Sequence, residues 1–450
     1  MVTAIVVVFL IGYLLIATES LTEINKSAVA LLMCVICWAL YALSGIGGEG
    51  IHEILEPALG EAGTTIFFLM GAMAIVELVD AYGGFNFVKR ILQTTSKRTL
   101  FWRVAILTAV MSAVLDNLTT TIVMLMILSK LVSNEKDMLI FASMVVLAAN
   151  AGGAFSPIGD VTTIMLWNGK MITAGKVITK LLLPSVASFV VPGLILQFRL
   201  HGELAYKPQS SALTKKLPYE AARRERYEVF IIGIGGLCCV PLFHTLTGLP
   251  PFMGILLIVG VLWVFTDILH RFVKKSSASI SNVLGKIDMS TILFFLGILM
   301  SVSVLSEIGV LSSLGQWLNE HVSNDYLQTG LIGVLSSIVD NVPLVAGTMK
   351  MYPVADAAMV AADPTLVGMV QDGIFWQLLA YCAGVGGSML IIGSAAGVIA
   401  MGITKMSFGW YLKNISWIAF IGYVSGILVF FLEELLFYQL DDFFHGHPSF

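Results

Sequence analysis

Ten apolar stretches run through the chain, and most are long enough to cross a lipid bilayer as a helix. A crossing helix needs about 20 largely apolar residues and satisfies all its backbone hydrogen bonds internally. Only 12% of the 450 residues are charged, about half the share in a typical soluble domain. The predicted spans lie near 2–18, 27–45, 64–80, 138–167, 176–200, 227–246, 252–270, 290–306, 373–403 and 411–437. The sequence therefore predicts an all-α polytopic membrane protein with the lipid bilayer as its surroundings.

Two further apolar regions, near 100–131 and 326–352, are each interrupted by the dipeptide Asp-Asn. The two dipeptides are Asp116-Asn117 and Asp340-Asn341. We interpret each region as a re-entrant hairpin, which enters and leaves the membrane on one side. About ten crossings then remain, and an even number of crossings places both termini on the same side.

The basic residues support this arrangement. With both hairpins re-entrant, 21 of the 25 lysines and arginines fall on one side of the membrane. Basic residues concentrate in cytoplasmic loops, and the split would disappear if either hairpin were a full crossing. The sequence therefore predicts that both termini lie outside. The acidic residues of the predicted outer loops are Glu49, Glu53, Glu56, Glu61, Glu307, Glu320, Asp325, Asp356, Asp363 and Asp372.

The two halves of the chain share a pattern. Three pairs of segments correspond: TIFFLMG at 65–71 with TILFFLG at 291–297, SAVLDN at 112–117 with SSIVDN at 336–341, and the glycines of 152–159 with those of 386–393. Each half has five crossings, an odd number, so the two copies must be inverted. We predict a first repeat at 1–200, a cytoplasmic linker at 201–226 and a second repeat at 227–450. Inverted repeats with interrupted helices are typical of alternating-access transporters.

Three aspartates lie at membrane depth, namely Asp116, Asp160 and Asp340. An aspartate in the middle of a membrane helix costs about 2.5–3.5 kcal/mol on insertion scales, so its presence indicates a function. Asp160 belongs to the segment 150–163, whose glycines and proline interrupt a helix and free backbone carbonyl groups. Carboxylate, carbonyl and hydroxyl oxygens are the ligands that hard cations prefer.

The predicted cation- and proton-binding site consists of short polar side chains near the two hairpins and the two broken spans. These residues are Asp116, Asn117, Thr119, Thr120, Asn150, Asp160, Thr162 and Thr163 in the first half, and Ser336, Asp340, Asn341 and Ser388 in the second half. Ser394 corresponds to Asp160, so the second broken span has lost its carboxylate. We therefore expect one principal site, with Na⁺ or Li⁺ held by Asp116, Asn117, Asn150 and Asp160.

No lysine or arginine lies near the breaks in the sequence, which favours a cation as the transported species over an anion. Carboxylates without their cation repel one another in a low dielectric and bind protons instead. Competition between Na⁺ and H⁺ for the same oxygens would produce antiport, and the exchange is electrogenic if two protons replace each cation. Structural roles stay open for some residues: Asp340 as a helix N-cap, Thr119 and Thr120 as hydroxyls bonded to their own helix, and Ser388 as a small packing residue.

Three segments resemble the NhaD family of sodium/proton antiporters: Asp116–Thr121, Asn150–Thr163 and Asp340–Pro343. That family is part of an ion transporter superfamily, which also contains dicarboxylate, citrate and arsenite carriers. The resemblance covers nearly the whole chain and implies exchange of Na⁺ or Li⁺ for H⁺ at the bacterial inner membrane, without a cofactor. It also implies two opposed hairpins, a homodimer and an elevator-like movement of a transport domain.

Other functions are weighed against this interpretation. A sodium-coupled carrier of a small anion or of arsenite, within the same superfamily, is the main alternative. An intramembrane aspartyl protease would use Asp116 and Asp160 as a pair, but Pro157 stands where the usual motif has a glycine. A channel is a further option, although inverted broken helices fit alternating access better. The sequence predicts a transporter and not an enzyme, and no basic surface suggests a nucleic-acid partner.

Overall fold

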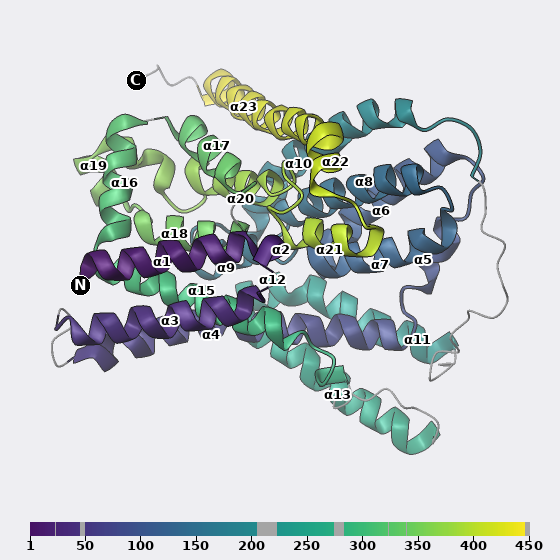
Figure 1. Ribbon diagram of the computed structural model, residues 1–450, viewed down its shortest axis with the longest axis horizontal. Helices are drawn as coiled ribbons and strands as arrows, with labels where there is room; N and C mark the ends of the chain where they lie inside the picture. Colours follow the sequence, from purple (N-terminus) through teal and green to yellow (C-terminus); the bar gives the residue numbers. More distant parts are fainter. Residues whose placement is uncertain are drawn as a thin grey trace. The chain divides into compact units, whose positions relative to one another are not determined.

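The computed structural model describes residues 1–22, 24–45, 50–204, 223–273, 283–322, 324–338 and 340–445. Within these ranges the regular structure is helical, apart from two isolated β-bridges. Nine described helical stretches are long and apolar enough to cross a membrane: Lys26–Leu43, Ile51–Ala81, Lys97–Leu115, Glu135–Ala154, Ala174–Arg199, Arg224–Thr247, Pro251–Leu269, Met289–Glu307 and Phe408–Leu436. The chain is therefore a multi-pass helical membrane protein (Figure 1).

Each of the two predicted broken spans consists of two shorter helices: 138–167 of α8 (Glu135–Ala154) and α9 (Val161–Asn168), and 373–403 of α20 (Ile374–Gly386) and α21 (Ala395–Thr404). Other helices depart from the prediction. Helix α6 (Lys97–Leu115), predicted as one arm of a hairpin, has the length and composition of a crossing helix. The re-entrant course of the two hairpins stays a prediction.

Helix α4 (Ile51–Ala81) begins well before the predicted start near residue 64. Glu53 and Glu61 therefore lie on a helix and not in the loop that their charges suggested. Pro57 also lies inside this helix. Glu61 also has a partner for its charge, because its carboxylate lies 2.6 Å from Nζ of Lys350.

The described residues form two compact units, and each unit takes segments from both halves of the sequence. Unit 1 contains described residues of Met1–Gln93, Tyr206–Trp317 and Ala346–Tyr352, and unit 2 contains those of Thr94–Ala205, Leu318–Val345 and Pro353–Phe450. This grouping by contact differs from the predicted division by repeat, which stays a prediction. Most of the predicted linker, residues 205–222 of 201–226, lies outside the described residues.

In unit 1, helix α3 (Lys26–Leu43) packs closely against α15 (Met289–Glu307). Gly297 permits the approach, because a Cβ atom there would lie 2.6 Å from the carbonyl carbon of Ala30. The indole Nε1 of Trp38 donates a 3.0 Å hydrogen bond to the carbonyl oxygen of Met300 and joins the same two helices. Small residues allow close helix packing in membrane proteins in this way.

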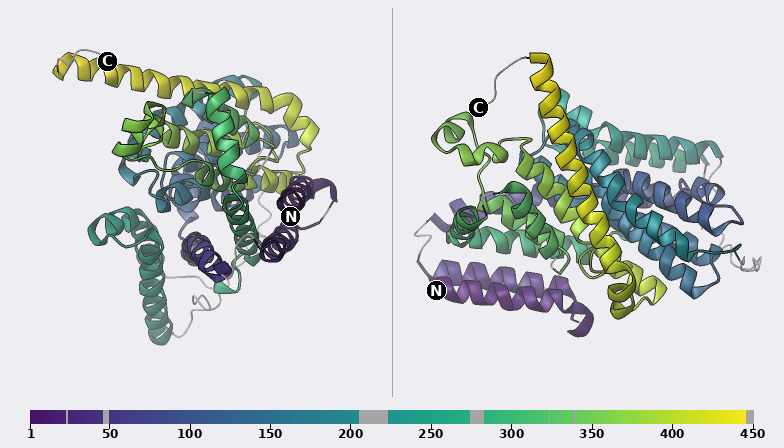
Figure 2. Two further views of the ribbon diagram at one scale, coloured as in Figure 1. Left: turned by 90° about the vertical axis from the view of Figure 1, so that its left-hand side faces the viewer. Right: turned by 90° about the horizontal axis from the view of Figure 1, so that it is seen from above.

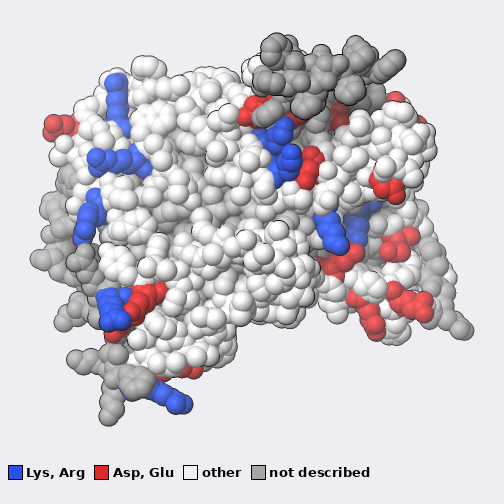
Figure 3. Space-filling view, turned by 180° about the vertical axis from the view of Figure 1, so that it is seen from behind, with Lys and Arg blue, Asp and Glu red and all other residues white. Residues whose placement is uncertain are grey.

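In unit 2, helix α10 (Ala174–Leu196) lies along the long α23 (Trp417–His445), which the views of Figure 2 show in yellow. Helices α6 and α8 (Glu135–Ala154) meet where Gly152 faces the backbone of Ala109. In the second half, Gly386 of α20 faces the backbone of Gly333 in α17 (Asp325–Leu335) in the same manner. Uncharged residues make up most of the surface visible in Figure 3, as a lipid-facing surface requires.

The two broken spans of unit 2 share their local structure. Helix α8 ends at Ala154 and α9 (Val161–Asn168) begins after Asp160, whereas α20 ends at Gly386 and α21 begins after Ser394. Asp160 and Ser394 have nearly the same backbone angles, φ −141° and ψ 148° against φ −143° and ψ 151°. Each caps the helix that follows with its side chain. The repeated sequence pattern therefore corresponds to a repeated local structure.

Candidate cation-binding site

Asp116 forms the break between helices α6 and α7 (Asn117–Leu131). Its φ of 81° lies in the region that favours glycine, and a non-glycine residue there costs about 1–3 kcal/mol of strain. Local hydrogen bonds hold this conformation: Oδ1 accepts from the backbone N–H of Thr119 at 2.7 Å, and Oδ2 accepts from its hydroxyl at 2.9 Å. The half-buried carboxylate thus caps the outgoing helix of the first hairpin.

Asp160 lies at the break of the first broken span, and only 1% of its surface is exposed. Its Oδ1 accepts from both the backbone N–H and the hydroxyl of Thr162, each at 3.1 Å. The hydroxyl of Thr163 donates to the backbone carbonyl oxygen of Asp160 at 2.8 Å. The start of α9 therefore fixes the orientation of this buried carboxylate.

Three asparagine amides connect Asp160 with the other breaks. Nδ2 of Asn117 donates to Oδ2 of Asp160 at 2.9 Å and to Oδ1 of Asn150 at 3.1 Å. Nδ2 of Asn341 lies 3.3 Å from both carboxylate oxygens of Asp160. Asn117 and Asn341 are the asparagines of the two Asp-Asn dipeptides, so both predicted hairpins converge on one carboxylate.

Asn150 extends this network into the second half of the chain. Its Nδ2 donates to the hydroxyl of Ser388 at 2.8 Å and to the hydroxyl of Ser394 at 3.0 Å. Asn150 is fully buried, and the two serines are 1% and 2% exposed. The two Asp-Asn breaks and the two broken spans of unit 2 thus meet in one buried polar network. Asp160 is the carboxylate of this network.

The charge of this network is negative. Among the described lysines and arginines, none forms an ion pair with Asp116 or Asp160. Asp116 and Asp340 both add electrostatic repulsion at Asp160. An isolated buried carboxylate is unfavourable without a compensating charge. The arrangement is therefore suited to a cation or to protons.

The structure uses some predicted residues differently. The hydroxyl of Ser336 donates to the backbone carbonyl of Ala383 at 2.8 Å, as that of Ser112 does to Ala149 at 2.6 Å. Ser336 thus joins the hairpin to the broken span and takes no part in the amide network. The hydroxyl of Thr120 is buried and makes no hydrogen bond among the described residues. Asp340 is half-buried at the second break.

Ser394 is a network member that the predicted binding set lacks. Its alignment with Asp160 in the second repeat was the signal that could have identified it, because equivalent positions of a repeat tend to face the same site. The structural alternative for Ser388, a small packing residue, is incomplete, since its hydroxyl accepts a hydrogen bond from Asn150. The structural alternative for Thr119, a hydroxyl bonded to a backbone carbonyl of its own helix, is not observed, because this hydroxyl donates to the Asp116 carboxylate.

Comparison with known proteins agrees with a transport site. The sequence profile of a family described as citrate transporter matches residues 13–371. The chain belongs to the citrate-transporter family. It is therefore a secondary transporter and not an enzyme, which excludes the aspartyl protease interpretation.

Several relatives of this citrate-transporter family member bear antiporter names. Sodium/proton antiporter 1 of Arabidopsis thaliana is 42% identical, over 97% of this chain and 73% of the relative. Sodium/proton antiporter 2 of the same plant is 41% identical, over 94% of this chain and 97% of the relative. The Na⁺/H⁺ antiporter NhaD of Vibrio cholerae is 28% identical, over 95% and 91%. The predicted resemblance to the NhaD family is confirmed.

A solved structure supports the fold of the citrate-transporter family member. The YdaH transporter of Alcanivorax borkumensis superimposes with a TM-score of 0.58, over 90% of this chain and 98% of that chain. The sequence identity is 13%, so the likeness concerns the fold alone.

Proposed function

We propose that the chain exchanges Na⁺ or Li⁺ for H⁺ and that Asp160 is the central cation- and proton-binding group. The observation that carries this proposal is the buried carboxylate of Asp160, held by amide and hydroxyl groups without a basic partner among the described residues. The names of the plant relatives, at 41–42% identity, support the same exchange.

The amides of Asn117 and Asn341 explain how one site serves both ions. In the structure both turn their NH₂ groups toward Asp160. A side-chain amide presents a carbonyl oxygen after a half-turn, so these groups can become ligands when a cation arrives. Asp160, Asn117, Asn150 and Asn341 would then surround the ion with oxygens, and Asp116 would add a second negative charge nearby.

Protons take the place of the cation when it leaves. Without Na⁺, Asp160 lies in a low dielectric and experiences repulsion from the carboxylates of Asp116 and Asp340. Protonation removes this repulsion and the cost of the buried charge. Alternating binding of Na⁺ and H⁺ to the same oxygens couples the two fluxes. If two of the three carboxylates take up a proton for each cation, the exchange is electrogenic.

The architecture in this proposal is the one that the sequence analysis predicts. Two inverted repeats, 1–200 and 227–450, would each contribute a re-entrant hairpin and a broken span, with both termini outside. Unit 2, which contains the whole polar network, would be the moving part of an elevator-like cycle. A homodimer in a bacterial inner membrane, as the resemblance to the NhaD family implies, completes the proposal.

A second candidate is a sodium-coupled carrier of a small anion, because the matching family is described as citrate transporter. A carboxylate substrate needs positive partners, such as lysine, arginine, helix N-termini or bound sodium. The network around Asp160 contains carboxylates, amides and hydroxyls, which favours the antiporter.

The deciding experiment uses everted vesicles from cells that lack other antiporters. An acid-inside gradient is formed, Na⁺, Li⁺, K⁺ or choline is added, and a dye reports ΔpH. Dissipation by Na⁺ and Li⁺ that is lost in Asp160→Asn supports the proposal. The control is Asp363→Asn, on an exposed turn, where asparagine can still cap the helix. Well-expressed protein that responds to no cation, but takes up citrate with Na⁺, would favour the anion carrier.

A further inference from the structure

Two side chains of unit 2 outside the network around Asp160 have buried amide atoms. They are Asn168, the last residue of α9, and Gln377, in the second turn of α20. Both amide atoms of Asn168 and the Oε1 atom of Gln377 are buried without a hydrogen-bond partner among the described residues. Buried polar atoms almost always have partners, so three such atoms indicate water or an ion at this position.

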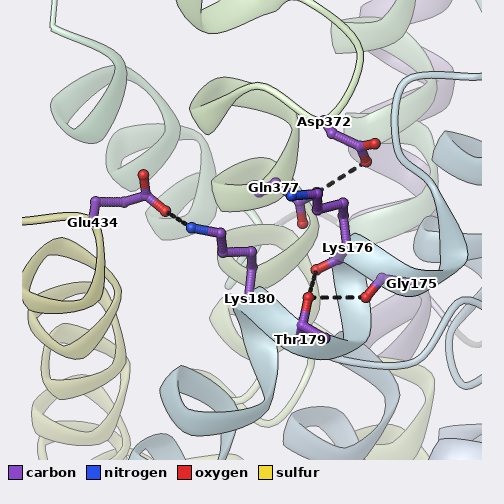
Figure 4. Close-up of polar contacts among 7 residues, drawn as sticks. All are labelled: Gly175, Lys176, Thr179, Lys180, Asp372, Gln377 and Glu434. Carbon is purple, nitrogen blue, oxygen red and sulfur yellow. Dashed lines mark hydrogen bonds and ion pairs between the residues drawn. The ribbon is translucent and has the colours of Figure 1, made fainter. Parts of the chain in front are cut away.

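The orientation of the Gln377 amide is determined by Asp372. Nε2 of Gln377 donates to Oδ1 of Asp372 at 3.2 Å, and a carboxylate can only accept hydrogen bonds from this amide. The carbonyl oxygen of Gln377, a residue only 2% exposed, must therefore face the other way and lacks a donor. Figure 4 shows this pair beside the first turns of α10.

Asp372 itself is held by the start of α10. Its backbone adopts φ 61°, and its carboxylate accepts from the backbone N–H of Thr173 at 2.6 Å and from the Thr173 hydroxyl at 2.8 Å. Its own N–H donates to the carbonyl oxygen of Met171 at 2.8 Å. We call this group of contacts, formed by Met171, Thr173 and Asp372, the Asp372 clasp. It joins the end of the first broken span to the start of the second.

Helices α9 and α20 connect the Asp372 clasp with Asp160. At one end a Cβ atom on Gly384 would lie 3.8 Å from Oδ2 of Asp160. At the other end the clasp joins the segments just beyond Asn168 and just before Gln377. Asn168 is eight residues from Asp160 and Gln377 is seven from Gly384, or about 12 Å and 10.5 Å along a helix. The two amides therefore lie at a similar level, between the clasp and the site.

We propose that Asn168 and Gln377 form a second station for Na⁺ or Li⁺, in which the ion keeps part of its water on the way to Asp160. The inference rests on the proposed cation exchange. Amide carbonyl oxygens are ligands that a hard cation prefers, and neutral ligands with water bind it more weakly than a carboxylate, as a station on a path requires. Asp372 is a positioning residue, because it keeps the Gln377 oxygen directed away from its own carboxylate. The predicted topology places this station on the outer side of the membrane.

The first test compares the Na⁺ concentration for half-maximal exchange in right-side-out vesicles. Gln377→Met removes the oxygen and keeps the volume, and we expect the half-saturating concentration to rise about three- to tenfold, as the loss of one polar contact implies. Gln328→Met is the matched control, because Gln328 is equally buried on α17 and its amide bonds to Asn319 at 3.2 Å. Equal curves for wild type and Gln377→Met would overturn the station, as would an equal rise in the control.

Asp372→Gly tests the positioning role. Glycine adopts a φ of 61° without strain. The variant removes Oδ1, which accepts hydrogen bonds from both the backbone N–H of Thr173 and Nε2 of Gln377, so the Gln377 amide becomes free to turn. We expect a higher half-saturating Na⁺ concentration at unchanged maximal rate. A purely structural role of the clasp predicts a lower maximal rate or less folded protein at unchanged half-saturation, and that result would remove Asp372 from the proposal.

A labelling experiment separates this proposal from the exchange itself. The five native cysteines are replaced by alanine, and Gln377→Cys or Asn168→Cys is treated with a membrane-impermeant, cationic thiol reagent. We expect Na⁺ to slow the labelling and choline to leave the labelling rate unchanged. The same result is expected in protein that also carries Asp160→Asn. Leu378→Cys, at a fully buried neighbouring position, should stay unlabelled. Labelling unaffected by Na⁺ would overturn the station even in an active antiporter, whereas Na⁺ protection in a protein without exchange would overturn only the proposed function.

Discussion

Nδ2 of Asn117 lies 2.9 Å from Oδ2 of Asp160, and this hydrogen bond joins the first hairpin to the first broken span. The two residues are 43 positions apart in the chain. Asn341, from the second hairpin, approaches the same carboxylate at 3.3 Å. One buried carboxylate is therefore the meeting point of both Asp-Asn motifs, which has consequences that can be measured.

Asn117→Ala should weaken exchange more than Asn341→Ala. The bond from Asn117 is shorter, and Asn117 also holds Asn150, so its loss affects two members of the network. We expect the half-saturating Na⁺ concentration to rise about tenfold for Asn117→Ala, because the variant lacks the amide oxygen that would turn toward the ion, and a polar contact with a charged group contributes about 1.5–3 kcal/mol. Dye-based ΔpH measurements on vesicles give both values. An unchanged half-saturation in both variants would contradict the role of the amides.

Asp160→Asn should abolish exchange while the protein still folds. Asparagine keeps the acceptor for Thr162 and the size of the side chain but removes the charge that a cation and a proton share. Thermal stability in detergent should be equal to or above that of wild type, since a buried charge without a basic partner is removed. A variant that exchanges Na⁺ at the wild-type rate would exclude Asp160 as the central group.

Ser394→Ala should reduce exchange less than Asn150→Ala. The Ser394 hydroxyl accepts one hydrogen bond from Asn150, at 3.0 Å, and one from the backbone N–H of Gly397, at 3.2 Å. Asn150, in contrast, connects Asn117 with both serines. We expect a change of about two- to fivefold for the serine, in line with one neutral hydrogen bond. Ser337→Ala is the control, because its hydroxyl bonds to Val334 within its own helix turn. A control effect equal to that of Ser394→Ala would argue against a role of Ser394 in the site.

Gly152→Ala should destabilise unit 2. A Cβ atom at this position would collide with the carbonyl oxygen of Ala109 and force α8 away from α6. Such overpacking costs about 1–3 kcal/mol, and a lower melting temperature in detergent would report it. Gly175→Ala in α10 is the control, because a Cβ atom at Gly175 would have no neighbouring atom within 4 Å. Equal melting temperatures for the two variants would show that the α6–α8 contact can relax.

Lys97→Ala should destabilise the protein more than Lys350→Ala. Nζ of Lys97 lies 2.8 Å from Asp137, with side chains that are 15% and 11% exposed, whereas the Lys350–Glu61 pair is 35% and 63% exposed. Removal of Lys97 leaves a buried carboxylate without its partner, which costs about 1–3 kcal/mol. Exposed pairs contribute about 0–1 kcal/mol. Melting temperatures in detergent, with Asp137→Asn/Lys97→Ala as a double variant that should recover stability, test this order.

The sequence predicts a helix well where the length of an apolar stretch sets the bounds of the helix. The stretches 27–45, 176–200 and 290–306 appear as α3, α10 and α15 with shifts of a few residues. The start of α4 was missed, because Pro57 and three glutamates look like a loop although the helix continues through them. Hydropathy reports what lies in lipid and does not report where a helix extends beyond it.

The sequence by itself determined that the chain spans a membrane, and it predicted where the helices break and that Asp116, Asp160 and Asp340 are the candidate carboxylates. Length, glycine, proline and intramembrane aspartate carry this information locally. Only the tertiary structure decided that Asn117, Asn150 and Asn341 bond around Asp160 and that Ser336 bonds to a backbone carbonyl instead. These partners come from segments up to 181 residues apart, and a side chain's position in a motif indicates its chemistry but not which distant group it will contact.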